Sequence, residues 1–240
     1  MEKEKKCYYK AKFIIVGEAG VGKTNLVHRF AKGEFNSNYA ITLGMDFLSS
    51  YIQVDEKFFN LELWDTAGSE KFRSISKGYY QNSTCAIVVY DITDRKSFLS
   101  VRQWVDDCKN FGNKNIIFVL VGNKSDLEFN RVVEKEEGKN LAEENSMMFY
   151  ETSALTGQNV ENVFFDACKI IGNNLDEGKY NFNDDNYGIK QCYTTKDLSI
   201  NKRRYSTFSK GNSDDEKNIK LKKGNKKKRN VAKNHNIANI

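Results

Sequence analysis

Short apolar runs alternate with longer amphipathic segments over the first three quarters of the chain. Apolar or alternating runs predict six strands, at 12–17, 50–54, 58–64, 85–90, 115–122 and 147–152. A 3.6-residue apolar periodicity predicts helices at 22–31, 97–110, 134–145 and 160–174. Because strands alternate with helices, we expect an α/β fold with a mostly parallel six-stranded sheet covered by helices on both faces.

The pattern stops at about residue 178. Beyond it, 217–233 is a low-complexity run of lysine and asparagine. Residues 1–178 carry 22 Lys+Arg and 26 Asp+Glu, whereas residues 179–240 carry 16 and 6. Such a tail buries too little apolar surface to offset the entropy cost of ordering. We therefore predict a short extension at 1–9, one domain at 10–178 and a disordered basic tail at 179–240.

The cysteine pattern and the hydropathy of the chain indicate in which compartment the protein is expected and how it can contact a membrane. The five cysteines are scattered without a Cys-x-x-Cys pair, so neither a zinc site nor a disulfide framework is indicated. Reduced thiols are typical of the cytosol. The charged start lacks the apolar core of a secretory signal, and no apolar run reaches the ~18–20 residues of a membrane helix. We expect a cytoplasmic protein with at most peripheral membrane contact.

A glycine-rich loop follows the first predicted strand and opens the first predicted helix. From Gly17 to Thr24 it matches the phosphate-loop pattern Gly-x-x-x-x-Gly-Lys-[Ser/Thr]. Backbone N–H groups and the helix N-terminus favour phosphate, Lys23 can reach the β- and γ-phosphates, and the Thr24 hydroxyl can ligate Mg²⁺. A chance glycine-rich turn is the weaker alternative in this context. The candidate phosphate-binding residues are Gly17, Glu18, Ala19, Gly20, Val21, Gly22, Lys23, Thr24 and Asn25.

A second phosphate-site motif, Asp65-Thr-Ala-Gly68, ends the strand predicted at 58–64. A carboxylate at the carboxyl end of a strand suits Mg²⁺ binding, and the Gly68 N–H can face a γ-phosphate. An ordinary turn would explain an isolated Asp-x-x-Gly better. Here the motif accompanies a phosphate loop, so we interpret it as part of the same site.

Two further strand ends carry residues suited to a guanine base. Asp126 of the sequence Asn-Lys-Ser-Asp can accept hydrogen bonds from the guanine ring N–H and its amine, a donor pair that adenine lacks. A site built on such bonds rejects an analogue without them by about 10⁴–10⁵. The Lys124 stem can lie along the base, and the loop after 147–152 offers backbone N–H groups. The candidate base-binding residues are Asn123, Lys124, Asp126, Leu127, Ser153, Ala154 and Leu155.

These motifs, in this order, resemble the Ras superfamily of GTPases, and finer features resemble its Rab branch. Leu43-Gly-Met-Asp-Phe47 is similar to the Rab switch I signature Ile-Gly-Val-Asp-Phe. Trp64-Asp-Thr-Ala-Gly-Ser-Glu-Lys-Phe-Arg73 is similar to the Rab switch II sequence, and the pair Tyr79-Tyr80 also matches. The resemblance covers about residues 10–174. It implies a phosphate-loop NTPase with a Ras-like G domain that binds GTP or GDP with Mg²⁺ and hydrolyses GTP.

The resemblance also implies roles by position. Thr42 is expected to close on Mg²⁺ and the γ-phosphate, Phe35 to stack near the guanine, and Tyr39 to cover the phosphates. Together with Gly68, Thr42 would hold the switch loops until hydrolysis releases them. The aromatic triad, defined as Phe47, Trp64 and Tyr79, would face effector proteins. A half-buried core position is the alternative for each of these three aromatics.

The chain departs from the Rab pattern in two places. Ser69 stands where the family has the glutamine that orients the attacking water, and its shorter side chain predicts slow intrinsic hydrolysis. No cysteine follows Cys192, where Rab proteins carry prenylated cysteines near the C-terminus. The remaining basic cluster between residues 220 and 229 suggests either weak attraction to an anionic membrane, worth ~1 kcal/mol per charge, or a solvated tail.

The expected partners follow from the same resemblance. They are a guanine nucleotide, effector proteins, an exchange factor and a GTPase-activating protein, with nucleic acid disfavoured because no aromatics interleave the basic cluster. We expect a monomeric switch in vesicle traffic. Two alternatives remain: a slowly hydrolysing, GTP-biased binding module, and a soluble Rab-like protein outside the membrane cycle.

Overall fold

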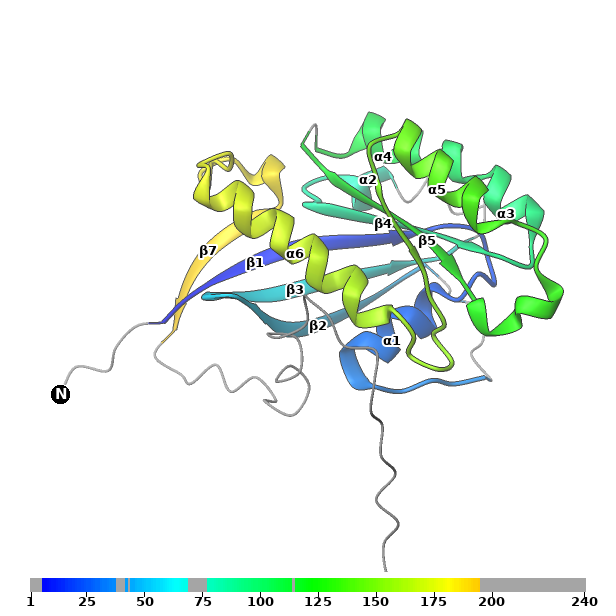
Figure 1. Cartoon of the computed structure of the whole chain (residues 1–240). Helices are drawn as coiled ribbons and strands as arrows, with labels where there is room; N and C mark the ends of the chain where they lie inside the picture. The colour runs from blue at the N-terminus through cyan, green and yellow to red at the C-terminus, as the bar shows by residue number, and fades with distance from the viewer. Residues whose placement is uncertain (1–5, 38–41, 43, 69–76, 114, 195–240) are drawn as a thin grey trace, which may run out of the picture. The chain divides into compact units, whose positions relative to one another are not determined.

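The structure is a computed structural model that describes residues 6–37, 42, 44–68, 77–113 and 115–194. Strands and helices alternate along the chain, as Figure 1 shows. The elements are β1 (Lys6–Val16), α1 (Lys23–Lys32), β2 (Met45–Val54), β3 (Lys57–Thr66), α2 (Lys77–Tyr80), β4 (Cys85–Asp91), α3 (Arg95–Leu99), α4 (Val101–Phe111), β5 (Ile117–Asn123), η2 (Ser125–Asn130), α5 (Lys135–Glu144), β6 (Met148–Glu151), α6 (Val160–Asp176), η3 (Asp185–Tyr187) and β7 (Ile189–Thr194).

One sheet organises these elements, in the order β2-β3-β1-β4-β5-β6. The pairs β3–β1, β1–β4, β4–β5 and β5–β6 are parallel, and β2 joins β3 as an antiparallel hairpin. All seven residues of β4 are buried, which explains its unbroken apolar run. The predicted α/β fold is confirmed, and the carboxyl ends of the parallel strands define where a ligand is expected.

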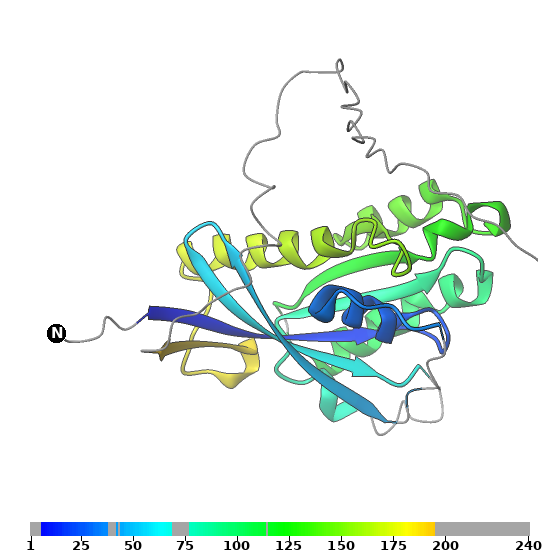
Figure 2. The same ribbon diagram turned by 90° about the horizontal axis from the view of Figure 1, so that it is seen from below.

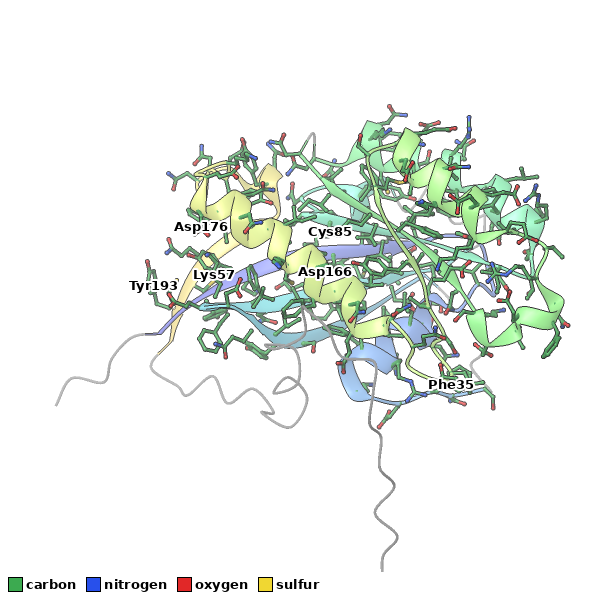
Figure 3. The ribbon with its side chains drawn as sticks, in the orientation of Figure 1. Phe35, Lys57, Cys85, Asp166, Asp176 and Tyr193 are labelled. Carbon is green, nitrogen blue, oxygen red and sulfur yellow. The ribbon has the colours of Figure 1, made fainter. Side chains whose placement is uncertain are left out.

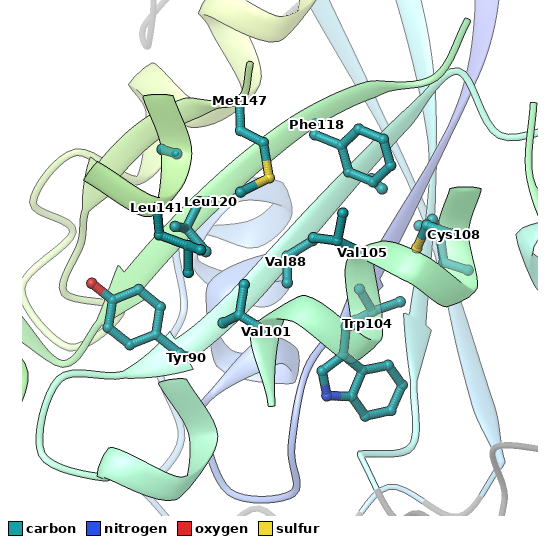
Figure 4. Close-up of a cluster of buried hydrophobic side chains, with 14 of the residues drawn as sticks. Val88, Tyr90, Val101, Trp104, Val105, Cys108, Phe118, Leu120, Leu141 and Met147 are labelled. Atoms are coloured by element: carbon teal, nitrogen blue, oxygen red, sulfur yellow. The ribbon is translucent and has the colours of Figure 1, made fainter. Parts of the chain in front are cut away.

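Two apolar layers hold the sheet between helices. On one face, Phe164 of α6 stacks on Phe30 of α1 and on Phe13 of β1, with ring centroids 3.9 and 6.3 Å apart. Lys57 of the β2–β3 hairpin also forms an ion pair with Asp176 at the end of α6, at 2.8 Å (Figure 3). On the other face, α2, α4 and α5 pack on β1, β4 and β5. Figure 4 shows part of this core, which includes Val88, Tyr90, Val101, Trp104, Val105, Cys108, Phe118, Leu120, Leu141 and Met147.

The helix predicted at 97–110 is two helices in the structure. The first begins earlier, because Asp94 caps it by accepting a hydrogen bond from the Lys96 N–H at 3.0 Å. Ser100 lies between α3 and α4, and its hydroxyl donates to the Lys96 carbonyl at 3.1 Å. The amphipathic pattern located the buried face and missed the break, because α3 and α4 contribute to the same face of the sheet.

The prediction that the whole of 179–240 is disordered is wrong for 179–194. This segment contains η3 and β7, which pairs antiparallel with residues 6–11 of β1 and adds a seventh strand (Figures 1 and 2). Tyr180 and Ile189 are buried, and Gly188 adopts a positive φ of 64°. A six-residue strand gives little signal alone, because the residues of β1 with which it pairs lie 178 to 188 positions earlier.

The domain bounds shift accordingly. β1 begins at Lys6, inside the predicted extension at 1–9, and β7 ends at Thr194. β7 pairs with Lys6–Ala11 and β4 with Phe13–Val16, so the two strands occupy successive stretches of the same edge of β1. The rest of the predicted tail, 195–240, lies outside the described residues. Within the described part, no helix is both long and apolar enough to cross a bilayer.

Candidate nucleotide-binding site

A cavity of about 400 Å³ lies at the carboxyl ends of the parallel strands. The residues that line it come from segments that the sequence motifs singled out, and Ser37 is the one residue among them that no motif indicated. The lining residues are Ala19, Gly20, Gly22, Lys23, Thr24, Asn25, Phe35, Ser37, Thr42, Gly68, Asn123, Lys124, Asp126, Leu127, Ala154 and Leu155. The topology thus brings the predicted phosphate and base motifs to one cavity.

The glycine-rich loop holds a buried ammonium at one end of this cavity. The Lys23 Nζ donates hydrogen bonds to the Gly17 and Glu18 carbonyls, at 2.9 and 2.8 Å. Burial lowers the pKa of Lys23 to about 8, and Asp65 and Glu18 partly offset that effect. A cation held by neutral carbonyls in a buried position can be stabilised further by a negatively charged phosphate.

Two positions of the loop require glycine, because neighbouring atoms lie too close for a Cβ. A Cβ on Gly17 would lie 2.1 Å from the Val89 carbonyl oxygen, and one on Gly22 would lie 2.4 Å from the Asn123 Nδ2. Both glycines also have positive φ values, 141° and 95°. The loop therefore lies directly on β4 and β5, which fixes its N–H groups relative to the sheet.

Three oxygens converge beside the loop in an arrangement that fits a hard divalent cation. The Thr24 hydroxyl donates to Asp65 Oδ2 at 2.5 Å and lies 2.9 Å from the Thr42 hydroxyl. The other Asp65 oxygen, Oδ1, is buried without a hydrogen-bond partner among the described residues. Burial raises the pKa of Asp65 to about 6, although the bond from Thr24 lowers it. An under-coordinated carboxylate among hydroxyls is a donor set that Mg²⁺ prefers.

Gly68 lies against the phosphate loop. A Cβ there would be 2.4 Å from the Ala19 nitrogen and from the Glu18 carbonyl carbon. The Asp-x-x-Gly segment is therefore in backbone contact with the loop, in keeping with the sequence interpretation. Ser69 and Tyr39 lie outside the described residues.

Asn123 connects the two ends of the cavity. This buried side chain donates to the Val21 carbonyl at 2.8 Å. Its oxygen accepts bonds from the Thr152 hydroxyl at 3.1 Å and the Ala154 N–H at 3.2 Å. One amide group therefore holds the phosphate loop, β5 and the loop after β6 in fixed relative positions.

The base end of the cavity has two positioned charges. Asp126 accepts a hydrogen bond from the Ser153 hydroxyl at 2.5 Å, which leaves its second carboxylate oxygen for a ligand. Lys124 adopts a left-handed conformation (φ 67°), and its Nζ lies 2.6 Å from Asp91 Oδ2. Sequence reasoning missed Asp91, which is buried at the end of β4 and is itself fixed by bonds from Thr93.

Arg29 is a second residue that the motifs did not indicate. Its guanidinium donates to the Ala154, Gly33 and Leu155 carbonyls, at 2.7, 2.8 and 2.6 Å. In a trans peptide the carbonyl and the N–H point in opposite directions, so holding the Ala154 carbonyl orients the Leu155 N–H. No sequence pattern could identify this role, because two of the three partners are backbone groups 125 and 126 residues away.

The three residues of the aromatic triad come together on the surface. Phe47 is 46% exposed and meets Trp64 edge-on at 5.9 Å, and Trp64 lies 6.1 Å from Tyr79. Phe35, which Figure 3 labels, lines the cavity and is half-buried.

Comparison with known proteins agrees with this geometry. A family model described as "Ras family" matches residues 12–173. The chain is 48% identical over 160 residues to Ras-related protein Rab-2B of Dictyostelium discoideum, a match that covers 67% of this chain and 79% of that protein. The chain therefore belongs to the Rab branch of the Ras family of small GTPases, and it is a GTP-binding switch.

Proposed function

We propose that this GTPase recruits effector proteins to endomembranes in its GTP state and releases them after hydrolysis, as a regulator of vesicle traffic. The observation that carries the proposal is a single cavity with Lys23 at one end and Asp126 at the other. Its membership of the Rab branch supports the trafficking role. An exchange factor and a GTPase-activating protein would act through the two switch segments.

In this proposal each residue has a defined task. Asp126 accepts the guanine donors, while Lys124 and the Ala154–Leu155 peptide border the base. Lys23 and the N-terminus of α1 stabilise the phosphate charge. Thr24, Thr42 and Asp65 would hold Mg²⁺, which supplies charge neutralisation at the phosphates when bound. Thr42 and Gly68 would report the γ-phosphate, since both lie at the phosphate end of the cavity.

The switching part of the proposal can be tested by hydrogen exchange. The backbone N–H groups of Thr42 and Gly68 are expected to exchange more slowly with GTPγS than with GDP, because only the triphosphate offers them an acceptor. The N–H groups of β4 are the internal control. Equal protection of both groups in the two states would contradict a switch built on these residues.

Slow intrinsic hydrolysis is also proposed, from Ser69. A serine hydroxyl is several bonds shorter than a glutamine amide and cannot reach the same water. Ser69→Gln should therefore accelerate single-turnover hydrolysis about tenfold or more at unchanged GDP affinity. Equal rates for the two proteins would refute this role of Ser69. A GTP-biased binding module is the second candidate, and persistently bound GTP in the purified protein would favour it.

Membrane association is proposed to be peripheral and electrostatic. The basic cluster of the tail would attract anionic lipid with ~1 kcal/mol per charge near the surface. Binding to phosphatidylserine vesicles should be clear at 50 mM salt and lost at 500 mM. Retention at high salt would indicate a lipid anchor or a protein receptor instead.

A further inference from the structure

A second cavity lies on the face of the sheet beside the aromatic triad, away from the nucleotide site. Its volume is about 310 Å³, and it opens between β1, β3 and β7. Three lysines, Lys10, Lys12 and Lys190, line it together with Trp64. Gly188, directly before β7, and Lys190 of β7 form one side, so the cavity exists because the segment after α6 folds back onto β1.

Two of the lysines already have carboxylate partners. Lys10 and Lys190 are directly opposite each other in the β1–β7 register, an arrangement that places like charges side by side. Lys10 forms an ion pair with Glu62 at 2.5 Å, and Lys190 forms one with Asp185 at 2.9 Å. These two carboxylates line the same cavity, which therefore carries one positive charge in excess.

Lys12 supplies that excess charge. Its Nζ donates to the Gln81 carbonyl at 2.7 Å and lies 4.1 Å from the centre of the Trp64 ring. No carboxylate of the described residues lies within ion-pair distance of it. Burial lowers the pKa of Lys12 to about 8, and the negative charge of Glu62 only partly offsets that effect. A partly buried ammonium without a directly paired carboxylate is stabilised by an anion that enters beside it.

The cavity is continuous with the aromatic triad. Trp64 forms part of the cavity wall and also contacts Phe47 and Tyr79. The indole nitrogen of Trp64 is buried without a hydrogen-bond partner among the described residues. A polypeptide that lies on the three aromatics can therefore place its next side chain over Lys12 without leaving the surface.

We propose that this cavity receives one aspartate or glutamate side chain of the effector protein that covers the aromatic triad, with Lys12 as its counter-charge. The inference rests on the proposed effector function and specifies the chemistry of the partner. A single carboxylate matches the one excess positive charge. A phosphate dianion would bring a second negative charge close to Glu62 and Asp185, which disfavours a phosphorylated partner or free phosphate.

The test uses short peptides as a defined probe, so no effector of this protein has to be known in advance. A random dodecapeptide phage library is selected on the full chain loaded with GTPγS, and synthetic peptides are measured by fluorescence polarisation. Selected peptides are expected to combine apolar residues with an acidic one. Replacing that acid by its amide should weaken binding about tenfold on the wild type and less than twofold on Lys12→Met. Lys139→Met, an exposed lysine of α5, is the matched control and should behave as wild type.

A second variant and an NMR titration make the result of the peptide experiment interpretable. Lys190→Met leaves the bond between Lys12 and Gln81 in place and should weaken acidic peptides about threefold. NMR of the Lys12 side chain should show its pKa rising towards the ordinary lysine value when peptide binds. The proposal is overturned if the library yields only peptides insensitive to Lys12→Met, no peptides at all, or peptides that millimolar phosphate displaces. Binding of a fluorescent GTP analogue, measured on the same variants, separates this failure from failure of the nucleotide function.

Discussion

Arg29 offers a sharp test of how the base end of the nucleotide site is held. Arg29→Met keeps the length of the side chain and removes its donors to the Ala154, Gly33 and Leu155 carbonyls. Since the guanidinium is only partly buried, each bond is worth about 1 kcal/mol after competition with water, or about 3 kcal/mol in total. The variant therefore loses this contribution to the stability of the ordered loop after β6.

The loss is expected to appear as faster release of GDP. If the full ~3 kcal/mol is lost from the bound state, dissociation accelerates about 100-fold, and partial compensation by water gives about tenfold. Displacement of a fluorescent GDP analogue in a stopped-flow instrument measures this rate directly. Lys32→Met is the matched control, because Lys32 is exposed at the end of the same helix. Release from Arg29→Met within twofold of this control would refute the positioning role.

Two further predictions concern a buried charge and the seventh strand. The folded-state pKa of Asp65 lies above its ordinary value, so its contribution to stability is fully present below about pH 4 and is lost as pH rises through about 6. Relative to wild type, Asp65→Asn should therefore gain up to about 3 kcal/mol in the free energy of unfolding between these pH values, measured by denaturant titration without nucleotide or metal. Gly188→Ala would put a Cβ 2.0 Å from the Asn82 carbonyl oxygen at a positive φ. It should detach β7, seen as faster exchange of the Lys190 N–H, which faces Lys10 of β1, while GDP affinity stays within twofold; unchanged exchange would contradict the close packing.

Local patterns predicted most of the fold and much of the site. Buried parallel strands are continuous apolar runs, and motifs such as Gly17 to Thr24 combine residue types that few other structures require. The order of the motifs along alternating strands and helices then placed them at one edge of the sheet. For these features the sequence carries the information within short windows.

The missed features depend on long-range contacts. Arg29 acts on backbone carbonyls, and Asp91 acts on Lys124 across two neighbouring strands, so neither leaves a local pattern. β7 was mistaken for disorder because its neighbourhood is polar, and its stability comes from pairing with β1 and from the buried Ile189. The break at Ser100 was hidden because helices on both sides of it pack on the same face.

The relative affinities for GDP, IDP and ADP test the central claim of a guanine-specific switch most directly. Inosine lacks the exocyclic amine that one oxygen of Asp126 would accept, and adenine lacks the ring N–H as well. We predict that IDP binds about 10–100-fold more weakly than GDP and ADP at least about 10⁴-fold more weakly. Comparable affinities for GDP and ADP in a competition assay would contradict the assignment of the base site and, with it, the proposed switch.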